Sequence, residues 1–579
     1  MTFLVMLAVS LGIAAGACAP GWKQTPHDRM FQREAVKPIP RVPERRPTSD
    51  WWDHGLQLIV RPIGRALSPG RWISGAMGGR AARDVNDLGQ VPDSDWFENR
   101  ISRRTMTVDE AFRGPTQTTG PAVGPLFVIS GKVDGATAGF VVRDRDGITW
   151  YLKLDPPASP ELSTSAEVIA SRLLWMAGYH VTEIHAIDIE ARRFLLDPKA
   201  KTKDRYGRKI PLTPLALDRL LRPLNTDKAG RIRVLVSRQP DGVVLGPFDY
   251  RGLDPDDAND KIPHEHRRSL RALWVFSAWL NNTDTRNQNS LDVFRPVDPA
   301  KPDGPGMIRH YLLDFGNSLG ATGTGEKIAE SGFEYIFDWR VIASNLFAVG
   351  LRTTRYQRLR RSPYRSVGIF EAKAFQPHDW RPTFPNPAFE ECTRSDTFWA
   401  ASVLARIQPD HIRAAVSAGR YHEDGATTHV VQTLLERRRK MLVYGFTGFL
   451  EIDQPRARGH VLIVDDLRAI GGLPNTGPLR YKVRWNRTRR ADRELAHGTV
   501  NTTTPDRATI HDTGEASVAH AGVLGEVQID LSSTLAALQR EAGFADDPFI
   551  TVELTRTRLS AQIHLRVVGD TLLPISLDR

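Results

Sequence analysis

The chain has 579 residues, too many for a single hydrophobic core, so its length predicts two or three domains. A composition of 41% hydrophobic and 25% charged residues is typical of a globular protein and excludes both a disordered chain and a multi-span membrane protein. The formal net charge of +11 favours anionic partners. The arginines are scattered and form no recognisable nucleic-acid-binding module, so we expect no nucleic acid among the partners.

The chain begins with an apolar run that leads to Cys18. This run is too short to span a bilayer comfortably and ends in small residues, as a cleaved export signal does. Small residues directly before a cysteine also resemble a lipoprotein processing site, so residues 1–18 predict a signal peptide with Cys18 as the lipidated residue. An ordinary signal peptide cut before Cys18 is the alternative, because Ala15 stands where Leu is usual. We expect an exported protein, anchored through Cys18 on the periplasmic side of a bacterial cell envelope.

The next two segments carry less periodic information. Residues 19–50 are rich in Pro, Arg and Lys, which predicts an extended tether. Residues 51–124 mix aromatic residues with turn signals, and we interpret them as a capping segment packed on the main domain.

From residue 126 the pattern becomes regular. Three short β-favouring runs, 126–130, 138–143 and 148–154, are separated by a glycine-containing turn and by a tight turn at Asp146-Gly147. An apolar stripe at helical spacing follows between Pro160 and Gly178. The predicted order is therefore strand, glycine-containing turn, strand, tight turn, strand, helix.

This unit carries residues suited to holding a nucleotide. Lys153 ends the third strand, and Glu167 lies near the start of the helix. A strand lysine can hold the α- and β-phosphates, and a helix glutamate can keep that lysine in place. Gly131, Gly135 and Gly139 frame the first turn, where backbone amides can approach phosphate oxygens closely. Taken singly, Lys153 is also typical of a half-buried strand lysine and Glu167 of a surface acid, and the glycine spacing also fits an ordinary hairpin.

A second group of polar residues follows a helix expected at 263–280. Asp284 and Asn289 form an Asp-x-x-x-x-Asn loop, and Asp314 ends the second strand of a hairpin predicted at 290–294 and 307–313. A hydroxyl that attacks the γ-phosphate of ATP needs a carboxylate to accept its proton, and Mg²⁺ needs an amide oxygen and a further carboxylate. Arg286 could reach the transferring phosphoryl group as a fixed cation. A polar surface turn is the alternative interpretation of the loop.

The last third of the chain separates into two patterns. Helical periodicity recurs at 333–351, 396–418 and 425–446. Beyond about 450 the chain alternates between apolar and polar residues, as at 550–554 and 562–567. We expect a separate β-rich C-terminal domain at 449–579, of the small-sandwich type.

Residues 125–448 resemble a divergent protein-kinase-like domain, closest to the HipA-type and phosphatidylinositol-kinase-like atypical kinases. The resemblance is carried by the Asp284/Asn289 loop and by Asp314 with the Phe-Gly that follows it. It implies an α+β, bilobal protein-kinase-like fold with a β-rich N-lobe and a helical C-lobe. It also implies that Lys153 contacts the phosphates of ATP and that Glu167 anchors this lysine.

The same resemblance assigns the remaining roles. It implies that Asp284 is the catalytic acid/base and that Asn289 and Asp314 bind Mg²⁺. Asn282 and Thr283 replace the usual His-Arg pair, and no Ala-Pro-Glu follows Asp314, so the substrate class stays open.

These observations predict a Mg²⁺-ATP-dependent phosphotransferase that acts on a protein or lipid-like hydroxyl at the cell envelope. An exported kinase meets little ATP, so a catalytically inactive kinase-fold lipoprotein that binds a partner is one alternative. A small-molecule phosphotransferase is another, although such enzymes usually have His where this chain has Asn282. The sequence shows no Cys/His metal cluster, no Gly-x-Ser-x-Gly elbow and no Walker-type loop that would favour another chemistry.

Overall fold

The computed structural model describes residues 30–33, 35–46, 79–131, 139–203, 208–221, 226–227, 229–338, 341, 344, 354, 356–359, 361–485, 493–503, 507–511 and 525–579. The predicted export signal with Cys18, much of the tether, part of the capping segment and Gly135 lie outside these residues.

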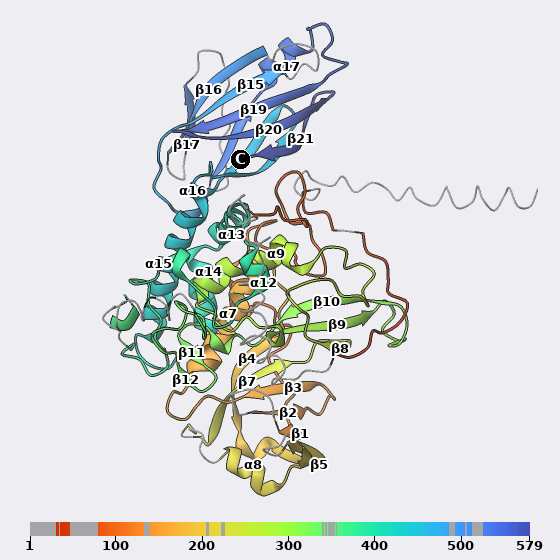
Figure 1. The fold of residues 1–579 in the computed structure, drawn as a ribbon, viewed down its shortest axis with the longest axis vertical. Coiled ribbons are helices and arrows are strands. Elements are labelled where there is room, and N and C mark those ends of the chain that lie inside the picture. Colours follow the sequence, from red (N-terminus) through yellow and green to blue (C-terminus); the bar gives the residue numbers. More distant parts are fainter. Residues whose placement is uncertain are drawn as a thin grey trace, which may run out of the picture.

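A seven-stranded sheet forms one end of the molecule, a helical body its centre, and a second β-rich unit the other end (Figure 1). The strand order in the first sheet is β4-β7-β3-β2-β1-β5-β6. Every neighbouring pair in it is antiparallel except β1 and β5. Its strands are β1 (Leu126–Gly131), β2 (Gly139–Arg143), β3 (Thr149–Lys153), β4 (Ile184–Glu190), β5 (Phe194–Lys203), β6 (Lys209–Pro211) and β7 (Arg231–Arg238).

One face of this sheet is a hydrophobic core. Alternating residues of the strands, among them Val128, Phe140 and Trp150, pack with Leu217 of helix α8 (Pro214–Leu221). The period-two pattern of the sequence therefore places the neighbouring residues, Tyr151 and Lys153 included, on the opposite face.

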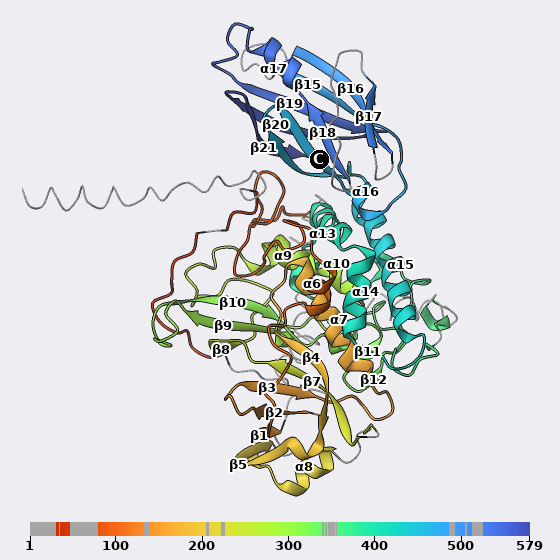
Figure 2. The same ribbon diagram turned by 180° about the vertical axis from the view of Figure 1, so that it is seen from behind.

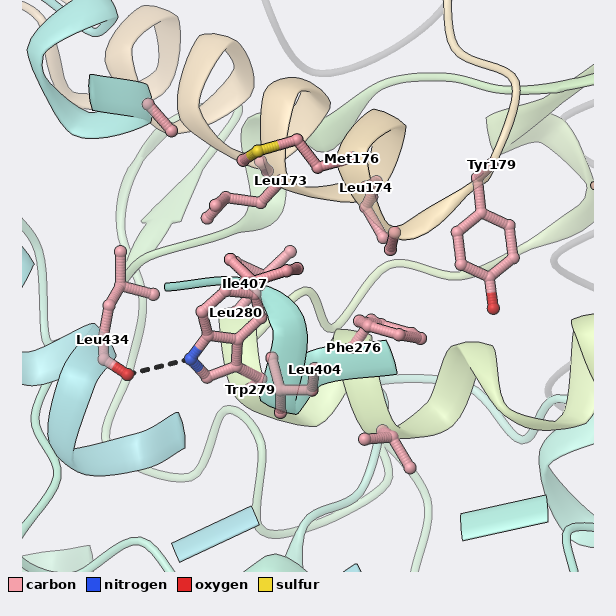
Figure 3. Packing of buried hydrophobic residues seen from close by; sticks show 14 of the residues in the cluster. Leu173, Leu174, Met176, Tyr179, Phe276, Trp279, Leu280, Leu404, Ile407 and Leu434 are labelled. Carbon is pink, nitrogen blue, oxygen red and sulfur yellow. Dashed lines mark hydrogen bonds between the residues drawn. The ribbon is translucent and has the colours of Figure 1, made fainter. Parts of the chain in front are cut away.

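Helix α7 (Leu162–Ala177) lies between the sheet and the helical body. All of its residues except Trp175 are buried, and helices α6 (Val108–Arg113) and α14 (Pro409–Ala418) pack against it (Figure 2). Its far end faces α10 (Leu273–Leu280), and Leu173, Leu174 and Met176 belong to the same hydrophobic core as Phe276, Trp279 and Leu280 of α10 (Figure 3). The helix ends at Gly178, where a Cβ would come within 2.3 Å of the Phe97 ring.

The helical body includes a three-stranded sheet and several further helices. Its other elements are β8 (Val243–Gly246), β9 (Ser290–Pro296), β10 (Gly306–Leu312), β11 (Ala321–Thr322), β12 (Gly325–Glu326), α9 (Arg268–Arg271), α12 (Pro387–Glu390), α13 (Arg394–Arg406) and α15 (Ala426–Phe446). Among the helices of the described residues, none is both long and apolar enough to cross a membrane.

Three predicted helices differ from the structure. The helix expected at 263–280 is broken, because Arg267 is extended and Asp84 accepts the backbone N–H of Arg268. The helix expected at 396–418 is two helices, since Pro409 begins α14 and lacks the N–H needed to continue α13. Residues 333–338 form turns and bends instead of the start of a helix, because the Ile336 amide bonds to the Thr383 carbonyl. Most of 339–351 lies outside the described residues.

The C-terminal unit consists of two packed sheets with the orders β13-β14-β18 and β17-β16-β15-β19-β20-β21. Alternating residues of both, such as Val464, Val483 and Ile563, share one core. Its elements are β13 (Ile452–Arg458), β14 (Val461–Asp466), α16 (Leu467–Gly471), β15 (Leu479–Trp485), β16 (Arg493–Thr503), β17 (Arg507–His511), β18 (Glu526–Asp530), α17 (Ser532–Leu538), β19 (Phe549–Arg556), β20 (Leu559–Val568) and β21 (Thr571–Asp578). The α+β fold class, with a β-rich lobe, a helical lobe and an added β-rich C-terminal part, is confirmed.

Buried charges join this unit to the helical body. Arg406 at the end of α13 pairs with Asp465 of β14 at 2.6 Å and lies 3.7 Å from Asp453 of β13. Gln90 of the N-terminal segment donates to the same Asp453 carboxylate at 2.8 Å. The contacts therefore fix the C-terminal unit on the body.

Candidate functional site

Lys153 at the end of β3 binds two carboxylates. Its Nζ donates to both oxygens of Glu167, at 2.9 and 2.8 Å, and lies 2.7 Å from Oδ1 of Asp314. Burial by itself lowers the pKa of Lys153, but the two carboxylates raise it above its usual value. Residues from β3, α7 and the segment after β10 therefore meet at one ammonium group.

A short connection between β3 and α7 explains why Lys153 and Glu167 meet. The Asp155 carboxylate, two residues after Lys153, accepts the backbone N–H groups of Ser163 and Thr164 at 2.9 and 3.0 Å. It thereby supplies acceptors for the first turn of α7, which otherwise lacks them. The strand end and the helix start are thus tied together, with Glu167 in the next turn.

Asp314 occupies a strained backbone conformation. Its φ of 55° and ψ of 63° lie in the left-handed region, which few residues other than glycine adopt. Phe315 after it is buried in the core, while a Cβ on Gly316 would come within 2.6 Å of Ser163 Oγ and 3.3 Å of Glu167 Oε2. The turn therefore passes close to α7 and leaves the Asp314 side chain 39% exposed beside Lys153.

Asp284 lies in a loop after α10 and is held by a cation. Nε of Arg286 donates to Oδ1 of Asp284 at 2.8 Å and Nη2 to Oδ2 at 3.2 Å, while Asn317 Nδ2 donates to Oδ2 at 3.3 Å. The Arg286 guanidinium also lies over the Phe384 ring, 5.3 Å from its centroid. In this structure Arg286 binds the carboxylate that was predicted to be the acid/base.

Asn289 links this loop to Asp314. Its Nδ2 donates to the carbonyl oxygen of Asp284 at 2.7 Å, and its own backbone carbonyl accepts the N–H of Leu313 at 2.9 Å. Oδ1 of Asn289 is therefore the side-chain atom that could bind a cation, and the backbone of Asn289 is hydrogen-bonded to Leu313, the residue just before Asp314.

The oxygen atoms of Asn289 and Asp314 suit Mg²⁺, which prefers carboxylate and carbonyl oxygens and keeps several waters. Within the described residues no group of three or more His, Cys, Asp or Glu side chains is arranged to hold a metal ion. A cation at this place would thus complete its shell with oxygens of phosphate and water.

The predicted glycine turn is described only at its two ends. Gly139 is buried on β2 opposite Lys153. A Cβ on Gly131 would come within 2.7 Å of Thr202 Oγ1 on β5, so packing alone explains that glycine. Gly135 lies outside the described residues, and a phosphate role for this turn stays a prediction.

The face of the sheet that carries Lys153 also has exposed apolar side chains. Tyr151 lies two residues before Lys153 on β3, stands opposite Val141 of β2, and is 43% exposed. Phe127 of β1 is 38% exposed. This surface could not be predicted from the sequence, because alternation shows that a strand has two faces but not which face stays open.

The backbone of the Asp284 loop is held by residues that sequence analysis did not select. Lys327 donates to the Asn281 carbonyl and to Thr283 Oγ1, and Trp380 donates to Asn281 Oδ1. The Thr383 amide donates to the Thr283 carbonyl, and the Asn386 side chain donates to the Thr285 carbonyl. These donors come from far along the chain and have ordinary residue types. No local signal in the sequence could have revealed them.

Comparison with family models and with curated proteins finds no match. Among solved structures the chain is similar to the proinflammatory kinase CtkA of Helicobacter pylori, with 10% identity over 56% of this chain and 95% of that one and a TM-score of 0.29. A Golgi casein kinase with Mn/ADP bound gives 10% identity over 73% and 95%, with a TM-score of 0.26. A second Golgi casein kinase structure gives 11% identity over 59% and 75%, with a TM-score of 0.23.

In this chain a β-rich lobe and a helical lobe meet where Lys153, Glu167 and Asp314 are in contact.

Proposed function

We propose that the chain is a Mg²⁺-ATP-dependent phosphotransferase. The observation that carries the proposal is the contact of Lys153 Nζ with both Glu167 and Asp314, in a segment whose neighbours Leu313 and Asn317 are hydrogen-bonded to the Asp284 loop. A structural salt bridge would need only one carboxylate, whereas phosphoryl transfer needs a fixed cation, a metal-binding carboxylate and a base within one site. The loop without a His-Arg pair is the basis for proposing a relation to HipA-type kinases.

The donor would bind between the sheet and the Asp314 turn. Lys153 would contact the phosphates while Glu167 keeps it oriented, and the open apolar face at Tyr151 and Val141 would take the flat base. Asn289 and Asp314 would hold Mg²⁺, which supplies positive charge to the phosphate oxygens.

The acceptor would be activated by Asp284. In the transfer step the acceptor oxygen forms a bond to the γ-phosphorus, the bond from that phosphorus to the bridging oxygen breaks, and ADP leaves. The hydroxyl proton goes to the Asp284 carboxylate. Arg286 must release at least one Asp284 oxygen for this step, and its guanidinium would then be placed to bind the transferring group.

We further propose that the acceptor is a protein or lipid-like hydroxyl at the cell envelope and that Cys18 provides a membrane anchor. Both proposals rest on the sequence of the N-terminal segment.

One observation favours a second candidate, a kinase-fold lipoprotein that binds a partner without catalysis. Both oxygens of Asp284 accept hydrogen bonds from Arg286. A carboxylate that stayed so paired would be a poor base.

Calorimetric titration of Mg²⁺-ATP into the full chain tests the proposal. We expect metal-dependent binding in the wild type, its loss in Asp314→Asn, because this variant removes a carboxylate ligand of Mg²⁺, and weakening by about 10- to 100-fold in Lys153→Met, because this variant removes the positive charge that faces the phosphates. Lys301→Met on the exposed β9–β10 turn is the matched control and should bind as the wild type does. Absence of Mg²⁺-dependent binding in the wild type would contradict the proposal and favour the partner-binding candidate.

A further inference from the structure

Lys327 is a buried lysine whose contacts converge on the Asp284 loop. It follows β12 and is 3% exposed. Its Nζ donates to the carbonyl oxygen of Asn281 at 2.5 Å and to Oγ1 of Thr283 at 2.8 Å. Asn281 directly follows α10 and Thr283 directly precedes Asp284, so the two acceptors lie where the helix ends and the loop begins.

The loop leaves α10 through a left-handed residue. Asn281 has a φ of 52° and a ψ of 38°, a helix end that glycine usually forms and asparagine also tolerates. Two contacts hold this residue at the start of the loop. Lys327 binds the Asn281 carbonyl, and Trp380 Nε1 binds its side-chain oxygen at 3.0 Å.

The turn that delivers Lys327 is itself anchored. The Lys327 amide donates to the Gly320 carbonyl at 2.9 Å, and the Leu319 amide donates to the Leu280 carbonyl at 2.9 Å. Gly320 has a φ of 86° and packs backbone to backbone against Gly368, where a Cβ would come within 1.9 Å of the Gly320 oxygen. The segment after Asp314 is thereby fixed to the end of α10 before Lys327 reaches inward.

The electrostatic setting also fits a fixing role. The C-terminal carbonyls of α10 attract cations, and Arg437 binds two of them, on Ala278 and Trp279. Burial lowers the pKa of Lys327 well below its usual value, with Asp284 raising it and Arg437 lowering it further. The amine keeps N–H donors in either protonation state, so both contacts survive.

We propose that Lys327 is a positioning residue that fixes the Asp284 loop in its working conformation and so sets the place of the Asp284 carboxylate. Its catalytic consequence rests on the proposed phosphotransferase function. In this proposal the segment after Asp314 carries the lysine that holds the Asp284 loop, the part of the site that would bind the acceptor hydroxyl.

The test compares Lys327→Met with Lys440→Met in the full chain. Lys440 is a matched control, because its Nζ also binds backbone carbonyls of the helical body, on Ala372 and Phe375, but none in the Asp284 loop. We expect Lys327→Met to raise amide hydrogen exchange at residues 281–289 by at least about 10-fold. It should lower the kcat for ATP turnover by about 10- to 100-fold, since small misplacement of a reacting group has effects of this size. The Kd for Mg²⁺-ATP should change by a smaller factor, because Asn289 is the one residue of the loop that is assigned to the metal.

A second variant, Thr283→Val, removes one acceptor and leaves the buried lysine in place. The double variant Lys327→Met/Thr283→Val should be no more affected than Lys327→Met alone, since contacting residues are not additive. Three results would each overturn the proposal. Lys327→Met could exchange its amides at 281–289 at the wild-type rate, it could raise exchange equally throughout the chain, or the effects of the two substitutions could be additive in the double variant. A wild-type chain without ATP turnover, in which Lys327→Met still raises exchange at the loop, would refute the proposed function and support the fixing role.

Discussion

The two halves of the candidate site are built in different ways. Around Lys153, charged side chains from three segments bind one another directly. Around Asp284, the charge pair with Arg286 sits on a loop whose backbone is held by donors from residues 327–386. One half is organised by charge and the other by backbone hydrogen bonds. Changes in the first should therefore impair donor binding, and changes in the second should impair transfer while binding persists.

The largest expected effect distinguishes the Asp284 half of the site from the Lys153 half. Asp284→Asn should lower ATP turnover, with water or the chain itself as acceptor, by about 10²- to 10⁴-fold, because the amide cannot accept the hydroxyl proton. The Kd for Mg²⁺-ATP should stay within about twofold of the wild type, since the role proposed for Asp284 is toward the acceptor hydroxyl and not toward the metal. Single-turnover kinetics and calorimetry measure the two quantities, with Asp298→Asn on the exposed β9–β10 turn as control. Unchanged turnover in Asp284→Asn would remove Asp284 from the chemistry.

A smaller effect tests how closely the Asp314 turn packs on α7. Gly316→Ala should lower the free energy of unfolding by about 1–3 kcal/mol, because the new Cβ overlaps Ser163 Oγ. Adding Ser163→Ala removes that oxygen and should restore most of the loss. Urea denaturation of the two variants measures this, and a Gly316→Ala chain as stable as the wild type would show that the turn has room to move.

The smallest expected effect concerns Glu183, which belongs to neither half of the site and so serves as a reference for both. Burial raises the pKa of Glu183, but hydrogen bonds from His185 and Thr118 lower it from 4.5 to about 2. A carboxylate with a lowered pKa stabilises the fold above its unfolded-state pKa, so this contribution should be lost as the pH falls from about 4.5 toward 2. Urea unfolding between pH 6 and pH 3 should show a shallower acid decline for Glu183→Gln than for the wild type. Mg²⁺-ATP binding at neutral pH should be the same in both, and equal acid slopes would contradict the assignment.

The charged members of the site could be selected from the sequence, because their chemistry depends on residue type and order. Lys153 at a strand end, Glu167 in the next helix, and an Asp-x-x-x-x-Asn loop before a strand with Asp314 are local patterns. The alternation of β1, β2 and β3 and the stripe of α7 are local as well, and the structure has these elements.

The remaining features depend on distant contacts. Lys327 has the residue type of a surface lysine, yet it is buried, and its amide binds the carbonyl of Gly320, which packs against Gly368. The break before α9 follows from Asp84, which lies far away in sequence. Arg286 was expected to face a phosphate, and its contact with Asp284 could be found only once the loop was folded.

The burial of α7 has a consequence for how this molecule could be regulated. Val168, Ile169, Leu173, Leu174 and Met176 are each no more than 1% exposed. Swinging the helix outward to separate Glu167 from Lys153 would expose these side chains to water at a cost of roughly 10 kcal/mol, at about 2 kcal/mol for each. That sum is comparable to the whole stability of a typical domain. An off state reached by moving this helix would border on unfolding, so a switch in this molecule would have to act on another element.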